Sequence, residues 1–376
     1  MNRRNLRHAG GGRRMPDRES GWQQALVDYV NAVNEDGLSG QAGTYRRVPD
    51  PEHRARLMRK YEAASDRRRP LRAKRVRSEI RARLLRKAEK ATEAECDVQL
   101  HLLHSYEQES LSWQEERLER ERIRFIRAGS RWRIDRIEPL ATERREEAWP
   151  VHEAEAGEGF GWGGRTVIPS VPYINPAAMT AFKSKVLAGP GAAGGGPGEG
   201  WFDPSRRGTP YRREETVAYA DRWWGEYNPA YEGFEVNCTN YVSQCIFAGG
   251  APMNYTGRRE SGWWYKGRVN GQELWSYSWA VAHGLQNYLS RPRSWGLRAE
   301  LVESPRQLML GDVICYDWDG NGRFQHNTVV TAFTPDGMPL VNANTISSRH
   351  RYWDYRDSYA WTERTQYRFF HIVDEF

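Results

Sequence analysis

One stretch decides how the C-terminal half folds: Asn237-Cys238-Thr239-Asn240-Tyr241-Val242-Ser243-Gln244-Cys245-Ile246-Phe247-Ala248-Gly249-Gly250. Its polar start runs into an apolar segment and stops at paired glycines, which is the pattern of a short helix with a cysteine in its first turn. Unpaired N–H groups and the positive end of the helix dipole favour a thiolate there, so we expect Cys238 to have a lowered pKa. The stretch therefore predicts a nucleophilic cysteine and, with it, a cysteine hydrolase.

The segments around this helix predict an α+β unit over residues 206–376. Residues 215–227 and 274–289 have the apolar spacing of amphipathic helices. Beyond residue 312 the apolar period falls to two, and turns rich in Asp and Gly separate short strand-like segments. Helices followed by an antiparallel β-meander make an α+β architecture.

The upstream part of the chain divides by composition. Residues 1–20 are Gly- and Arg-rich without a hydrophobic period, which predicts a disordered tail. Residues 21–150 are expected to form a charged, mostly helical domain, because apolar residues between 51 and 129 recur at helix-compatible spacings. Alternation around Gly129-Ser130 predicts one small β-hairpin in it. Residues 151–205 are rich in Gly and Pro and are expected to form a linker.

The charge balance leaves the kind of partner open. A net charge of +7 suits an anionic partner such as a cell-wall polymer, a membrane surface or nucleic acid. The excess comes largely from arginines in the N-terminal half, where charged, solvated helix faces are common. Nucleic-acid binding is disfavoured, because Glu-rich turns follow the arginine clusters and no series of stacking aromatic residues is interleaved with them.

The sequence lacks two signals that would direct a protein to a membrane or out of the cell. No stretch reaches the roughly 18 to 20 apolar residues of a membrane span. The basic start lacks the apolar core of a secretory signal peptide. We therefore expect a cytoplasmic protein by default, which would meet a cell wall or spore after lysis or inside a sporulating cell. The oligomeric state is not defined by the sequence.

Motifs and cysteine spacing exclude several other classes. The four cysteines include no CxxC pair, so a zinc site is not expected. GxSxG, HExxH and GxxxxGK[ST] are absent, which leaves a thiol as the covalent nucleophile, with no metal or cofactor required. Residues 317–322 match the first half of a calcium loop, but Thr328 stands where the twelfth-position acid is needed. A hairpin turn explains their glycines better.

A cysteine hydrolase needs a base beside the thiol and a group that orients this base. His326 is the expected base, because it opens a predicted strand next to a loop. Asn344 is the expected orienting residue; Asn342 has the same chemistry and lies on the same face, so the choice between them stays open. The backbone N–H of Cys238 and the side chain of Asn237 are candidate oxyanion donors, although a helix cap is the favoured role for Asn237.

Simpler interpretations compete with each of these roles. Free cysteines are often buried, and Cys245 and Cys315 are expected to be core residues because apolar neighbours flank them. Trp264 and Trp318, with other tryptophans, are candidates for a substrate cleft. In a domain with this many aromatic residues, tryptophan is more often part of the core.

Several blocks resemble the bacterial putative amidase domain family: the Asn-Cys-Thr-Asn block above and residues 218–224, 227–229, 248–253, 277–279, 311–317 and 326–331. The family is similar to the NlpC/P60 and CHAP cysteine hydrolases, which have a papain-like core. The resemblance covers about residues 211–376. It implies a catalytic Cys238–His326 pair and a peptide or amide substrate of the peptidoglycan type. Family members usually carry His at the position of Asn344, although related papain-like enzymes also use Asn for orientation.

The sequence thus predicts a cysteine amide hydrolase that acts on peptidoglycan or its fragments. The alternative is a catalytically weakened papain-like fold that binds a cell wall or a protein partner, with residues 50–125 as a helical docking arm. The departure at Asn344 is compatible with either hypothesis.

Overall fold

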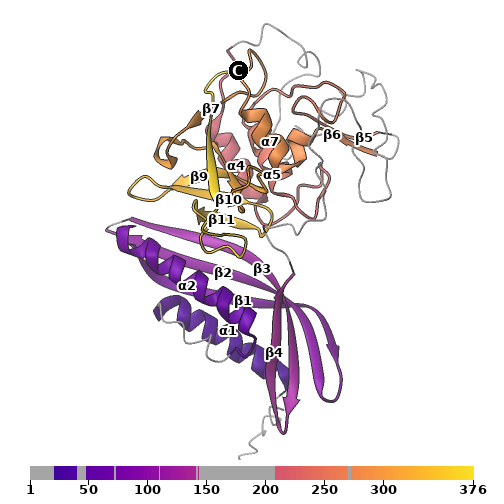
Figure 1. The fold of residues 1–376 in the computed structure, drawn as a ribbon, viewed down its shortest axis with the longest axis vertical. Helices are drawn as coiled ribbons and strands as arrows, with labels where there is room; N and C mark the ends of the chain where they lie inside the picture. The colour runs from indigo at the N-terminus through magenta and orange to yellow at the C-terminus, as the bar shows by residue number, and fades with distance from the viewer. Residues whose placement is uncertain are drawn as a thin grey trace, which may run out of the picture.

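The computed structural model describes residues 21–39, 48–71, 73–109, 111–140, 143, 208–269 and 272–376. The predicted tail and the predicted linker lie outside the described residues. Figure 1 shows two lobes along the long axis of the molecule, the N-terminal lobe (described residues 21–143) and the C-terminal lobe (residues 208–376).

The N-terminal lobe is an antiparallel sheet with two helices on one face (Figure 1). Its elements are α1 (Trp22–Ser39), α2 (Pro51–Leu71), β1 (Lys74–Glu89), β2 (Glu93–Gln108), β3 (Leu111–Ala128) and β4 (Arg131–Pro139). The helices and the sheet share a buried apolar core, to which Trp22, Leu57, Val98, Leu100, Ile123 and Phe125 belong.

The prediction of a mostly helical domain is wrong beyond Leu71, because residues 74–128 form three long strands instead. The predicted hairpin is confirmed as β3 and β4, which join at Gly129-Ser130, with Gly129 in the left-handed region at a φ of 64°. Every second residue from Glu115 to Phe125 is buried, and the first four of them are charged. Charged residues therefore occupy the inward face of a strand, so no apolar period of two marks it in the sequence.

The C-terminal lobe is α+β, as predicted. Its helices are α4 (Arg213–Trp223), α5 (Cys238–Ala248), α6 (Tyr277–Ala280), α7 (Ala282–Leu289) and the 3-10 helix η3 (Pro305–Gln307). Its strands are β5 (Tyr265–Val269), β6 (Gln272–Trp275), β7 (Ala299–Val302), β8 (Val313–Asp317), β9 (His326–Phe333), β10 (Pro339–Ala343), β11 (Ser348–Tyr352) and β12 (Gln366–Ile372). Strands β5 and β6 form a separate pair, and all pairings in this lobe are antiparallel.

One sheet runs through both lobes, in the order β1-β2-β3-β11-β10-β9-β8-β12-β7, with β4 beside β3. The lobes join where β3 pairs with β11, at Arg117 opposite Ser348 and Glu116 opposite Arg349. Figure 1 shows β11 lying on the long strands of the N-terminal lobe. The sequence analysis did not predict this connection, since it joins segments more than 200 residues apart.

The C-terminal sheet is buried on both faces. Val313 and Cys315 of β8 pack with Cys245 of α5 in the core on the helix side. Ile314 and Tyr316, which alternate with them, belong to a second core on the other side, under the segment that follows β11. No helix among the described residues is both long enough and apolar enough to cross a membrane.

Candidate active site

Helix α5 begins at Cys238 and stops before Gly249-Gly250, as predicted. Asn237 precedes it in the N-cap position, but its side chain makes no capping hydrogen bond. Thr345 caps the helix instead: its hydroxyl oxygen accepts the backbone N–H of Asn237 and of Cys238, each at 3.0 Å. The loop after β10 therefore satisfies the first donors of α5, and the predicted cap is wrong.

The thiol of Cys238 is buried, yet its pKa is lowered. Burial alone raises the pKa, because a low dielectric disfavours the thiolate. The positive charge and the closeness of the His326 ring oppose burial, with smaller contributions from the backbone of Asn327 and the hydroxyl of Thr239. Together these effects outweigh burial and lower the pKa to about 7. The structure thus brings the two predicted residues, Cys238 and His326, into interaction range.

The other three cysteines behave in the opposite way. Burial raises the pKa of Cys96 to about 12 and raises those of Cys245 and Cys315 well above the ordinary thiol value. Cys245 and Cys315 are fully buried core residues, as predicted. Cys238 is therefore distinguished from the remaining thiols by its ionisation.

Alkylation of Cys238 by iodoacetamide should follow a midpoint near pH 7, because only the thiolate reacts. The rate should rise between about pH 6 and pH 8, whereas Cys245 and Cys315 should stay unreactive in the folded chain. Timed alkylation across this range, with peptide mapping by mass spectrometry, measures each rate. A Cys238 midpoint at the ordinary value of about 8.5 would contradict the lowered pKa.

His326 is the first residue of β9, and aromatic rings enclose its imidazole. The ring stacks on Trp318, with centroids 5.8 Å apart and planes 27° apart, and lies 5.4 Å from Tyr316 and 5.2 Å from Tyr355. Neither ring nitrogen has an aligned hydrogen-bond partner among the described residues. Cys238 is thus close to the imidazole without an aligned hydrogen bond to it. Ring packing, rather than an amide, fixes the orientation of the imidazole.

Asn344 and Asn342 have other roles than orienting His326, so this prediction is wrong. The Nδ2 of Asn344 donates to main-chain carbonyls at the end of α4, and its Oδ1 accepts from Asn237 Nδ2 at 2.7 Å. The Nδ2 of Asn342 donates to Asp221 Oδ1 at 2.8 Å. Both amides tie β10 to the surrounding helices. Local spacing could not reveal these long-range partners.

The side chains of the remaining candidates, Asn237, Trp264 and Trp318, also make structural contacts. The Oδ1 of Asn237 accepts from Asn240 Nδ2 at 2.9 Å, and its Nδ2 is bound as described above, so the side chain is not free to stabilise an oxyanion. Trp264 and Trp318 are fully buried. Their indole N–H groups donate to the main-chain carbonyls of Ser261 at 3.0 Å and Glu143 at 3.1 Å. Neither tryptophan lines an open substrate cleft.

The thiol and the imidazole are closed from solvent. Cys238 is 1% exposed and His326 is 0% exposed. Amide hydrolysis at this pair therefore requires a movement that admits the substrate. The sequence analysis missed three residues that define the closed site, Thr345, Tyr316 and Tyr355. Tyr316 could have been found, because it is next to Cys315 in a predicted strand and so faces the opposite side of the sheet. Tyr355 lies in a segment without a hydrophobic period, so no pattern in the sequence marks it.

The turn between β8 and β9 is a hairpin connection, as predicted. The carboxylate of Asp317 accepts backbone N–H groups from Asp319, Gly320 and Gly322 at 3.2, 2.9 and 2.6 Å. This carboxylate is therefore occupied by the turn itself. In the described part of the chain, no group of three or more His, Cys, Asp or Glu side chains is arranged to hold a metal ion.

The C-terminal lobe is thus an α+β domain in which a helix begins at an ionisable thiol next to an imidazole. Residues 210–370 match the family model described as "Putative amidase domain". This match supports an amide-hydrolase type of domain, and it does not extend into the N-terminal lobe.

A relative with the name "Uncharacterized protein YhbB", from Bacillus subtilis (strain 168), is 54% identical over 165 residues. The alignment covers 44% of this chain and 51% of the relative, so this chain spans about half the length of that protein. No solved structure matches the chain.

Proposed function

We propose that the C-terminal lobe is a cysteine amide hydrolase of papain-like type, with Cys238 as the nucleophile and His326 as the base. One observation carries the proposal: the pKa of a fully buried thiol at a helix start is lowered to about 7 by its histidine neighbour. A buried thiol without a function is expected to have a raised pKa, as the other three cysteines do. Perturbation by a specific partner is characteristic of catalytic groups.

In the proposed mechanism, His326 takes the proton of the Cys238 thiol, and the sulfur attacks the amide carbonyl carbon. The carbonyl oxygen becomes an oxyanion and replaces the Thr345 hydroxyl as acceptor of the N–H groups of Cys238 and Asn237. These two donors already converge on one oxygen at 3.0 Å, within the range that an oxyanion site requires. His326 then protonates the leaving amine. Water, deprotonated by His326, attacks the thioester and releases the acid and the free thiol.

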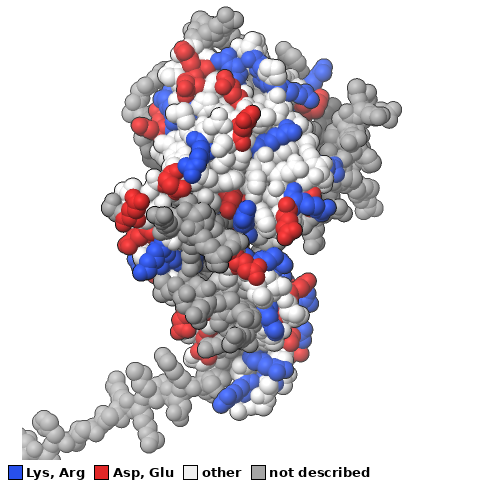
Figure 2. Space-filling model, turned by 60° about the vertical axis from the view of Figure 1, so that its left-hand side comes forward, with Lys and Arg blue, Asp and Glu red and all other residues white. Residues whose placement is uncertain are grey.

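The proposed substrate is a peptide or amide of the peptidoglycan type. The amidase description of the matched family supports cleavage of a C–N bond. The net charge of +7 suits an anionic polymer. In Figure 2, basic and acidic side chains are interspersed over the visible face, so the described residues there form no continuous basic patch of the kind that favours nucleic acid.

Incubation of the full chain with purified muropeptides, followed by mass spectrometry, tests this function. We expect products heavier in sum than the substrate by one water, from cleavage of an amide bond. Iodoacetamide pretreatment at pH 7 should abolish their formation in proportion to Cys238 modification. Product formation that is unaffected by complete Cys238 alkylation would exclude the proposed nucleophile.

A second candidate is a binding module that retains the fold without the chemistry. The closed thiol–imidazole pair and the engagement of the Cys238 N–H by Thr345 favour it. This candidate predicts that the chain binds muropeptides or wall fragments without cleaving them, even when Cys238 is reactive toward iodoacetamide.

A further inference from the structure

A loop of the C-terminal lobe covers the imidazole. This covering loop, residues 353–361, follows β11 and places Tyr355 against His326. Tyr355 has a φ of 52°, in the left-handed region that a bulky residue adopts only when its surroundings hold it there. Its phenol oxygen lies 3.1 Å from Ser348 Oγ. The conformation of the loop is therefore set by its contacts and not by local preference.

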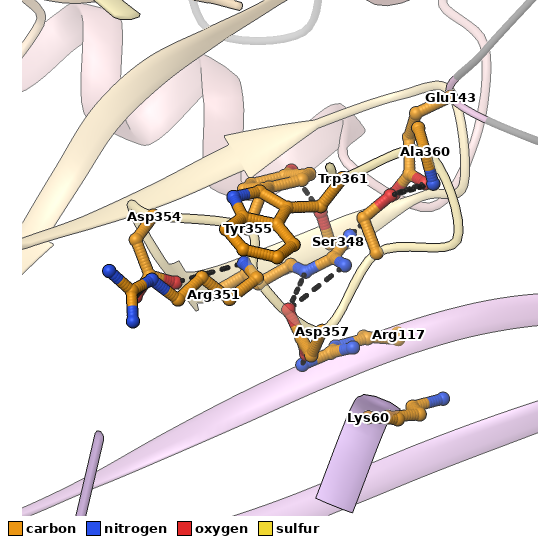
Figure 3. A network of polar contacts seen from close by, with 12 residues as sticks. Lys60, Arg117, Glu143, Ser348, Arg351, Asp354, Tyr355, Asp357, Ala360 and Trp361 are labelled. Carbon is orange, nitrogen blue, oxygen red and sulfur yellow. Dashed lines mark hydrogen bonds and ion pairs between the residues drawn. The ribbon is translucent and has the colours of Figure 1, made fainter. Parts of the chain in front are cut away.

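Several of these contacts come from the N-terminal lobe, as Figure 3 shows. Arg117 of β3 forms an ion pair with Asp357 of the covering loop. Glu143 accepts a hydrogen bond from Ser358 Oγ at 2.6 Å, and its other carboxylate oxygen lies 2.5 Å from Arg351 Nη1. We call Arg117 and Glu143, with their partners Arg351, Asp357 and Ser358, the interlobe clamp.

The N-terminal lobe also contacts Trp318, whose ring stacks on His326. The main-chain carbonyl of Glu143 accepts the indole N–H of Trp318 at 3.1 Å, and Trp318 stacks on His326. Glu143 thus contacts both structures that enclose the imidazole, the covering loop and Trp318.

The interlobe clamp fixes the position of the covering loop but contributes little net free energy to the association of the lobes. Its charged side chains are only 1% to 4% exposed, and the desolvation of buried charges offsets most of their mutual attraction. The apolar cores of the two lobes are separate clusters. A cavity of about 50 Å³, lined in part by Arg117 and Asp357, interrupts the packing beside the clamp. Release of the clamp therefore exposes no shared apolar core and leaves the pairing of β3 with β11 in place.

We propose that the N-terminal lobe is a built-in inhibitor of the site: through the interlobe clamp it fixes the covering loop and Trp318 on His326 and keeps substrate from Cys238. This inference rests on the proposed hydrolase function. Release of the clamp frees the loop, opens the site and leaves the C-terminal fold intact.

Alkylation of Cys238 in the full chain tests the clamp without relying on catalysis. Asp357→Asn and Glu143→Gln keep the shape of each side chain; the first removes the charge that pairs with Arg117 and Arg351, and the second removes the charge that pairs with Arg351. Each variant should raise the Cys238 alkylation rate at pH 7 roughly tenfold or more, because a charged hydrogen bond is worth about that factor in an opening equilibrium. Asp97→Asn is the matched control: its carboxylate pairs with Arg122 inside the N-terminal lobe, so its rate should equal that of the wild type.

The buried thiols Cys245 and Cys315 report unfolding in the same experiment, and they should remain unreactive in every variant. Faster alkylation of Cys238 alone, with faster muropeptide hydrolysis, is the expected result. Faster alkylation without any hydrolysis would support the clamp proposal and contradict the proposed hydrolase function. Rates equal to those of Asp97→Asn, or equal acceleration at Cys245 and Cys315, overturn the clamp.

Discussion

Replacing Cys238 by alanine should lower kcat/KM for amide hydrolysis by a factor on the order of a thousand or more, because covalent catalysis is lost together with the nucleophile. Alanine is a good helix former, so α5 should keep its length. The thiol makes a 3.7 Å contact with Thr239 Oγ1, and its removal breaks no strong hydrogen bond. The measurement is muropeptide turnover by mass spectrometry at matched protein concentrations.

Cys245→Ala is the matched control for this loss. Cys245 lies on the same helix, two turns further along, and its thiol is fully buried with a raised pKa. Its truncation should destabilise the lobe by about 1 kcal/mol through a small cavity and leave kcat/KM within about threefold. If the Cys238 and Cys245 variants keep equal activity, Cys238 is not the nucleophile.

The thiol–imidazole pair could be predicted because its signals are local. A polar turn, a cysteine and a glycine stop define the start and end of α5 within fourteen residues. His326 could be placed at the start of a strand because turn residues precede it. The residue that orients the histidine could not be predicted from local signals. Asn344 has the right chemistry for orienting a histidine, but Asn237 and the end of α4 engage it, and both lie over a hundred residues away.

The N-terminal lobe shows where pattern analysis fails. Strand β3 carries charged residues on its inward face, and these charges have partners in other elements: Glu119, for example, pairs with Lys60 of α2 at 2.7 Å. A periodicity rule counts such residues as solvated and therefore favours a charged helix. The pairing of β3 with β11 also cannot be predicted from local sequence patterns, because it depends on which strand edge each folded lobe leaves available.

Burial and the neighbouring His326 act in opposite directions on the pKa of Cys238, so a thiol that is closed from solvent keeps a lowered pKa. Burial is the largest single effect and raises the thiol pKa, but the charge and closeness of His326 and the contacts of Asn327 and Thr239 together lower it by more. Opening of the covering loop would remove part of the burial, which favours the thiolate further. In the proposed mechanism, access of the substrate to the thiol, more than ionisation of the thiol, is therefore the step that this chain can control.

Replacing Arg351 by alanine should destabilise the protein by about 3 to 5 kcal/mol, because it leaves the buried carboxylate of Glu143 without its cation and Asp357 with Arg117 alone. Arg351 is 2% exposed, and it pairs with Glu143 at 2.5 Å and with Asp357 at 3.1 Å. Burial alone lowers the pKa of its guanidinium, but these carboxylates raise it well above the ordinary value, so the side chain stays charged. Its guanidinium also lies 3.8 Å from the centre of the Tyr355 ring.

Urea denaturation followed by circular dichroism measures this loss, with Arg136→Ala as the control. Arg136 pairs with Glu138 at 2.7 Å, but both side chains are largely exposed, so this change should alter the free energy of unfolding by less than about 1 kcal/mol. The contrast follows from the position of the charges, since both arginines have a carboxylate within contact distance. An Arg351 variant as stable as the Arg136 variant would mean that water reaches the clamp, and the covering loop would then need another anchor.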